Sequence, residues 1–121
     1  MTNQSFLDKW LGKRYRESAE LGYQCVWLVK LYYEEVYGIH GLSFGWSALS
    51  GWQKKGNLQD ILDIVTQPQV GDMTFFNKTP TNPYGHVGIY QDQKTLLEQN
   101  WGTGGSTGLG KDAIGLWKMR A

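Results

Sequence analysis

The chain has 121 residues, of which 40% are hydrophobic and 14% aromatic, and its formal net charge is +1. This length provides one domain, residues 1–121, with a hydrophobic core, and the scattered Lys and Arg residues argue against a nucleic-acid partner. A single cysteine excludes an internal disulfide and a cysteine-built zinc site.

The N-terminal half of the sequence predicts helices. Apolar residues recur at helical spacing over residues 3–12, and this segment ends at a glycine. The pattern returns over residues 23–37 and again ends at a glycine, whereas the five glycines of residues 38–56 indicate loops and short helical turns. A further short helix is expected over residues 58–65, with Asn57 as its N-cap.

The C-terminal half predicts an antiparallel sheet, because the apolar period changes to that of strands after Pro68. Strands are expected over residues 70–77, 86–90, 95–100 and 114–120. We also expect a turn-rich loop over 79–85 and a glycine-rich loop over 102–110. Helices that precede a sheet, without strand–helix alternation, indicate the α+β class with N-terminal helices packed on a C-terminal antiparallel sheet.

The helix that contains Cys25 is the centre of the predicted fold. Its apolar stripe is Leu21, Cys25, Leu28, Tyr32 and Val36. Gly22 suggests that the helix begins there, so Cys25 falls in the first turn, where unpaired backbone N–H groups and the helix dipole favour a thiolate. The alternative is that Cys25 is a small, inert, buried side chain.

A histidine and two polar residues downstream supply the partners that such a thiolate needs. His86 opens a strand at an exposed rim position, and Glu98 and Asn100 lie on one face of the next strand. Gln99 points to the opposite face. If the strands pair, a carboxylate or amide near Nδ1–H of His86 leaves Nε2 for Cys25. The sequence thus indicates a Cys25–His86 pair oriented by Glu98 or Asn100, the alternative being that these are surface residues.

Four short segments carry a resemblance to a known family. They are residues 22–25, 70–76, 85–90 and 98–100, with the sequences GYQC, VGDMTFF, GHVGIY and EQN. Each is weak alone, but their order and separations together resemble the CHAP domain, a family of cysteine, histidine-dependent amidohydrolases and peptidases of the papain-like superfamily. The resemblance covers nearly the whole chain.

The resemblance implies a papain-like fold and a peptidoglycan hydrolase that forms a cysteine thioester. The bond would be that of an N-acetylmuramoyl-L-alanine amidase or of a stem or cross-bridge endopeptidase. Cys25 matches the nucleophile and His86 the general base. Glu98 matches the residue that orients the histidine, and Asn100 the fourth polar member. Gln24 matches the glutamine before the nucleophile. Together with the Cys25 N–H, it is expected to stabilise the oxyanion. The alternative is that Gln24 only caps the helix.

Aromatic side chains are candidates for the walls of a substrate groove. The candidates are Tyr23, Trp27, Trp46, Trp52, Tyr84 and Trp101. Among them, Tyr84 and Trp101 are expected to bind substrate, because they stand beside His86 and Asn100 in the sequence.

No cofactor and no metal are expected. Many related domains carry a calcium loop of aspartates before the GYQC segment, but residues 15–20 contain no aspartate, so no calcium is predicted there. Residues 105–111 match the spacing of a phosphate-binding loop, yet Asp112 replaces the Ser or Thr that would hold magnesium. A loop that lines the groove is the expected role of this segment.

The chain is expected to be a monomer whose partner is bacterial peptidoglycan. A longer parent protein that also carries a wall-binding domain is one option. The sequence shows neither a secretory signal nor an apolar run of the ~20 residues that span a bilayer, so no membrane insertion is expected. The resemblance, of the phage-lysin type, implies action at the cell wall after release from a host cytoplasm or from a phage particle. The alternatives are a Cys/His amidase or transpeptidase acting on a soluble peptide, and a non-catalytic wall-binding module.

Overall fold

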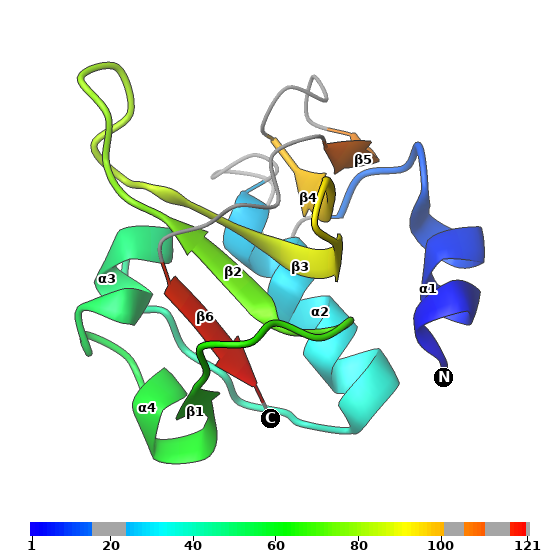
Figure 1. The fold of residues 1–121 in the computed structure, drawn as a ribbon, viewed down its shortest axis with the longest axis horizontal. Helices are drawn as coiled ribbons and strands as arrows, with labels where there is room; N and C mark the ends of the chain where they lie inside the picture. The colour runs from blue at the N-terminus through cyan, green and yellow to red at the C-terminus, as the bar shows by residue number, and fades with distance from the viewer. Residues whose placement is uncertain (16–23, 101–105, 111–116, 121) are drawn as a thin grey trace.

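The computed structural model describes residues 1–15, 24–100, 106–110 and 117–120 of the chain. The helices in this part of the chain are α1 (Asn3–Trp10), α2 (Cys25–Tyr37), α3 (Ala48–Trp52) and α4 (Leu58–Ile61). The strands are β1 (Asp63–Ile64), β2 (Met73–Phe76), β3 (His86–Asp92), β4 (Thr95–Gln99), β5 (Thr107–Gly110) and β6 (Trp117–Arg120) (Figure 1). None of these helices is long and apolar enough to cross a lipid bilayer.

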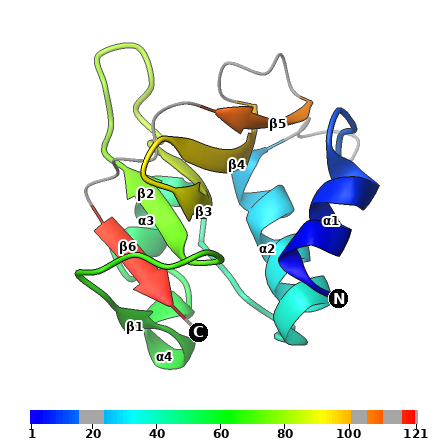
Figure 2. The ribbon, with the colours of Figure 1, turned by 45° about the vertical axis from the view of Figure 1, so that its right-hand side comes forward.

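The strands form one sheet in the order β1-β6-β2-β3-β4-β5, and every neighbouring pair is antiparallel. The long helix α2 packs across β3 and β4, and α1 packs beside α2 (Figure 1, Figure 2). The short helix α3 packs against β2 and β3. Helices packed on an antiparallel sheet confirm the predicted α+β class.

The main core is built around α2. The buried side chains of this helix are Trp27, Leu28, Val29, Leu31, Tyr32 and Tyr33. Only Leu28 and Tyr32 belong to the predicted stripe, which assumed a single buried face. Because α2 lies between the sheet and α1, it buries a wider arc. The helix ends at Gly38 as predicted.

Two predicted segments differ from the structure. The helix expected over 58–65 ends at Ile61, and the chain then enters β1, which pairs with β6. Part of the glycine-rich loop expected over 102–110 is strand β5, which pairs with β4. Gly108 and Gly110 form this ladder through their backbones, without the alternating apolar side chains by which a strand is recognised.

Asn57 occupies the N-cap of α4 as predicted, but its side chain makes no capping hydrogen bond. Its Oδ1 accepts from the N–H of Ser43 at 2.8 Å, and its Nδ2 donates to the carbonyl oxygen of Gly41 at 2.8 Å. The side chain therefore fastens the loop before α3 and not the helix that follows it.

An ion pair joins the last strand to the segment before β2. The carboxylate of Asp72 is buried and accepts from Arg120 Nε at 3.0 Å and Nη2 at 3.1 Å, and from the N–H of Gln69 at 2.8 Å. Arg120 Nη2 also donates to the carbonyl oxygen of Gln67 at 2.7 Å. The Arg120 side chain is 33% exposed, so the carboxylate is the partner that has lost its water.

Replacing Arg120 by Met is expected to lower the free energy of unfolding by more than the loss of an exposed ion pair does, because the buried Asp72 carboxylate loses its cation. Equilibrium unfolding in urea measures the change. The matched control is Lys9→Met, which breaks the exposed Lys9–Glu35 ion pair and should cost less than about 1 kcal/mol. Equal losses in the two variants would contradict this account of the buried pair.

Candidate active site

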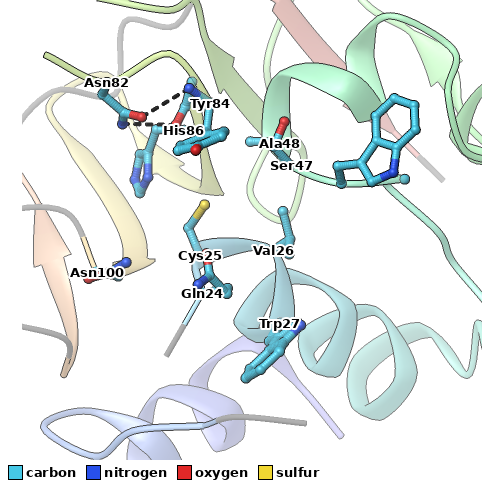
Figure 3. Close-up of a pocket in the computed structure, with 13 residues that line it drawn as sticks. Gln24, Cys25, Val26, Trp27, Ser47, Ala48, Asn82, Tyr84, His86 and Asn100 are labelled. Carbon is cyan, nitrogen blue, oxygen red and sulfur yellow. Dashed lines mark hydrogen bonds between the residues drawn. The ribbon is translucent and has the colours of Figure 1, made fainter. Parts of the chain in front are cut away.

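A pocket of about 420 Å³ opens at the N-terminus of α2. Its lining comes from residues 24–27, from residues 45–48 at the start of α3, from residues 82 and 84–86 at the entrance to β3, and from Asn100 after β4 (Figure 3). The predicted site residues among them are Gln24, Cys25, Tyr84, His86 and Asn100. The fold thus gathers segments that are far apart in the sequence around one concave surface.

Cys25 is the first residue of α2, and its half-buried thiol lines the pocket. Figure 3 shows its Sγ pointing toward His86. The backbone N–H groups of a first helical turn lack partners within the helix, and the helix dipole places partial positive charge there. The position of the thiol on the pocket wall argues against the alternative of an inert side chain sealed in the core.

His86 begins β3 directly after Gly85, which has a φ of 68°. A Cβ at Gly85 would also lie 2.6 Å from the carbonyl oxygen of Phe76, so this entry to the strand needs glycine. The imidazole is only 1% exposed, which corrects the predicted exposed rim position. Because β3 lies between β2 and β4, neighbours on both sides cover the ring, including Phe76 at a centroid distance of 5.8 Å.

Glu98 reaches the imidazole from β4. Its Oε1 lies 3.3 Å from Nε2 of His86, and its side chain is 2% exposed. The predicted assignment, with a carboxylate or amide at Nδ1, is therefore wrong, and Nδ1 is the nitrogen left for Cys25. The orientation of the ring depends on side-chain torsions, which the sequence pattern does not contain.

The backbone of β5 confines the Glu98 carboxylate. A Cβ added to Gly110 would overlap Oε2 of Glu98. A side chain at position 110 would therefore force the buried carboxylate to move, and glycine at this point avoids the overlap.

The surroundings of His86 act on its pKa in opposite directions. Burial disfavours the charged ring and lowers the pKa, whereas hydrogen bonding and charge from Cys25 and Glu98 raise it. The raising effects prevail, so the pKa of His86 lies above its ordinary value of 6.5. An imidazolium that persists to higher pH stabilises a neighbouring thiolate.

Gln24 and Asn100 also line the pocket. Asn100 is exposed and has a φ of 63°, and β4 ends one residue before it, so the strand alternation that would place it with Glu98 does not extend this far. Gln24 is the N-cap residue of α2, but its side chain makes no capping hydrogen bond, contrary to the alternative that it only caps the helix. The catalytic and oxyanion roles of these residues stay predictions.

Two aromatic rings of the pocket are strongly exposed. Tyr84, which the sequence singles out for substrate binding, is 67% exposed, and Trp46, which it names only among the wider candidates, is 84% exposed. Trp27 is buried, and Trp52 packs on Phe75 in the core. Trp101, the other residue predicted to bind substrate, and Tyr23, one of the wider candidates, lie outside the described residues.

Asn82 is a pocket residue that sequence reasoning missed. Its Oδ1 accepts from the N–H of Tyr84 at 3.1 Å, and its Nδ2 donates to the carbonyl oxygen of Gly85 at 3.1 Å (Figure 3). These bonds shape the turn that presents both Tyr84 and His86. The Asn82-Pro83 pair was the available signal, because this dipeptide marks turns in which the asparagine side chain bonds to the backbone.

The expectation that calcium is absent and the expectation about the phosphate-loop spacing both concern segments that the structure describes only in part. Within the described residues, no group of three or more His, Cys, Asp or Glu side chains gathers as a metal site would. Residues 16–20, which belong to the segment expected to lack calcium, lie outside that part of the chain. In the segment with the phosphate-loop spacing, residues 107–110 form strand β5 and not a loop.

The pocket therefore combines a thiol at a helix N-terminus with an imidazole of raised pKa, and a buried carboxylate lies next to that imidazole; these are the groups used in nucleophilic catalysis by cysteine. The family model that matches the chain is the CHAP domain, over residues 14–100, which is more than half of the sequence. No curated protein matches the chain. The chain therefore belongs to the CHAP domain family, whose members are generally cysteine- and histidine-dependent hydrolases.

Proposed function

We propose that the chain is a peptidoglycan hydrolase that cleaves an amide bond of the bacterial cell wall through a thioester on Cys25. The observation that carries the proposal is the position of His86, which lies between the thiol of Cys25 and the carboxylate of Glu98. Family membership supports hydrolysis of this general kind. The proposal includes a papain-like arrangement and treats residues 1–121 as one catalytic domain.

In the first half of the reaction, the Cys25 thiolate attacks the carbonyl carbon of the wall amide. The tetrahedral intermediate collapses when the C–N bond breaks, and the imidazolium of His86 gives its proton to the leaving amine. The Cys25 N–H and the Gln24 side chain are the donors proposed for the oxyanion. Preorganised donors of this kind contribute about 3 kcal/mol each to the transition state.

In the second half, a water molecule attacks the thioester. Neutral His86 takes a proton from the water, the C–S bond breaks, and the carboxylic acid product leaves. The proton held by His86 and the thiolate of Cys25 are then restored as the starting ion pair. One amide bond and one water are consumed, and one acid and one amine are formed.

Glu98 and Asn100 are proposed to support His86 in different ways. Glu98 faces Nε2, where its charge stabilises the imidazolium and its position holds the ring with Nδ1 toward Cys25. Asn100 lines the pocket as an exposed amide, which suits a polar contact at the site. The strength of the Glu98 effect comes from the near absence of water around the pair.

The pocket rim is proposed to select the bond that is cut. An amidase acting between muramic acid and L-alanine and an endopeptidase acting in the stem or cross-bridge share the same chemistry, so the active-site groups do not distinguish them. The exposed rings of Trp46 and Tyr84 offer apolar faces to a sugar ring or a short peptide. We propose Tyr84 and Trp101 as substrate contacts, and we add Trp46.

The setting that we propose is the bacterial cell wall, reached by a phage-lysin type of protein that acts as a monomer. A wall-binding domain in a longer parent protein would raise the local concentration of the catalytic domain at its polymeric substrate. The sequence resemblance supports this setting.

Replacing Cys25 by Ala is expected to reduce fragment release from purified peptidoglycan by at least about 1,000-fold, because the nucleophile is lost. Clearing of a wall suspension gives the rate, and mass spectrometry of the released fragments identifies the bond. Val70→Ala, an exposed change outside the pocket lining, is the control and should keep full activity. Wild-type clearing by the Cys25 variant would rule out the enzyme, and wall binding without clearing by the unaltered chain would favour a binding module.

The alkaline limb of the pH dependence of kcat/KM is expected above pH 6.5, because the pKa of His86 is raised from that value and activity falls as the imidazolium loses its proton. Glu98→Gln removes a charge that raises this pKa, so the limb should move to lower pH and kcat should fall. Glu35→Gln, which alters an exposed ion pair, should leave the profile in place. A limb that stays or rises in the Glu98 variant would contradict the assigned role.

Replacing Trp46 by Ala is expected to raise KM roughly fivefold with little change in kcat, because about 1 kcal/mol of stacking on the substrate is lost before the chemical step. Initial rates over a range of soluble wall fragments measure both constants. Val70→Ala removes a similarly exposed apolar side chain outside the pocket lining and should change neither constant. A fall in kcat alone would assign Trp46 a structural effect on the site.

A further inference from the structure

The buried amide of Gln99 joins two segments of the chain to the end of β4. Its Oε1 accepts from the N–H of Tyr15 at 2.8 Å. Its Nε2 donates to the carbonyl oxygen of Tyr15 at 2.8 Å and to that of Gln24 at 2.9 Å. The side chain is fully buried, so these bonds are shielded from competing water.

The partners fix the orientation of the Gln99 amide. The Tyr15 N–H can only donate, and the carbonyl oxygens of Tyr15 and Gln24 can only accept. Exchanging the amide oxygen and nitrogen would place donor against donor and acceptor against acceptor at all three contacts. The side chain therefore has one arrangement that satisfies it.

The contact with Gln24 acts on the peptide unit that leads into the nucleophile. A peptide unit is planar and trans, so the carbonyl oxygen of Gln24 and the N–H of Cys25 point in opposite directions within one plane. By holding this oxygen, Gln99 fixes the direction of the Cys25 N–H and the start of α2. The same oxygen also accepts the N–H of Trp27 at 3.2 Å, a 3₁₀-type bond at the start of the helix.

Consecutive residues of β4 thus serve the two sides of the site. Strand alternation sends Glu98 and Gln99 to opposite faces of the sheet. Leu97, on the face of Gln99, belongs to the main core with α2, whereas Leu96, on the face of Glu98, packs with Tyr90 in a second cluster. One strand end therefore reaches both the imidazole and the helix that carries the thiol.

We propose that Gln99 is a positioning residue for the nucleophile. Its amide holds the Gln24–Cys25 peptide so that the thiol faces His86 and the Cys25 N–H faces the oxyanion. The proposal rests on the proposed function for the meaning of this geometry, but it concerns a contact that exists without substrate.

The test compares two glutamines whose amides both join a strand to another part of the chain. Gln99→Met keeps an unbranched side chain and removes the three hydrogen bonds. Gln91→Met is the matched control, because the Gln91 amide exchanges hydrogen bonds of 2.8 and 3.1 Å with Asn3 of α1, outside the pocket lining. Cys25 is the only cysteine, so iodoacetamide reports on one thiol.

For Gln99→Met we expect the rate at which iodoacetamide alkylates Cys25, measured at about pH 6, to fall about tenfold or more. We expect kcat on peptidoglycan to fall by a similar factor and KM to change by less than about twofold. Gln91→Met should keep both rates even where unfolding in urea shows a comparable loss of stability. Wild-type alkylation and kcat in a destabilised Gln99→Met would overturn the proposal. If the unaltered chain does not hydrolyse walls, the proposed function fails, and the alkylation comparison still decides the role of Gln99.

A measurement on the unaltered chain decides the question if Gln99→Met does not fold. Alkylation of Cys25 should shift the side-chain amide NMR signals of Gln99, because the two are joined through the Gln24 carbonyl, and should leave those of Gln91 in place. Unshifted Gln99 signals would overturn the proposal.

Discussion

The burial of His86 beside Glu98 is the constraint on which the rest of the site depends. Each side chain would cost several kcal/mol as an isolated buried charge, so each is tolerable only with the other within reach. That pairing requires one register of β4 on β3, since a slip of one residue would turn Glu98 to the opposite face of the sheet. The same register places Gln99 where it meets the segment before α2.

The thiol, the imidazole and the carboxylate are consequently carried by regular elements and not by loops. The thiol stands on the first residue of a helix, the imidazole on the first residue of a central strand, and the carboxylate within the neighbouring strand. Gly110 allows β5 to close over the carboxylate, which keeps water away from the pair and strengthens its effect on the imidazole. Rigid placement of this kind suits chemistry that depends on short distances between reacting groups.

The periodicity of apolar residues in the sequence could predict the helices and strands, but not which of them lie side by side. The helix that carries Cys25 and the strands that carry His86 and Glu98 were predictable, because each has a local pattern of apolar residues. The burial of His86 was not, because it results from strands β2 and β4 on either side, and strand order is a long-range property. Strand β5 was missed because its glycines contribute backbone hydrogen bonds without a side-chain pattern, and the facing nitrogen of His86 depends on torsions that no spacing encodes.

Membership of the family says more about the class of reaction than about the substrate, because the two depend on different parts of the structure. Cys25, His86 and Glu98 are buried or half-buried and are held by the sheet and α2, so their arrangement follows from the fold. Trp46 and Tyr84 lie on segments between elements and expose most of their rings, an arrangement that core packing does not require. Because a tryptophan in the core and one on a rim look alike in the sequence, only the structure separates Trp46 from Trp27. The rim residues can therefore change without disturbing the buried pair, which is why we place the choice of substrate bond in the proposed function with the rim.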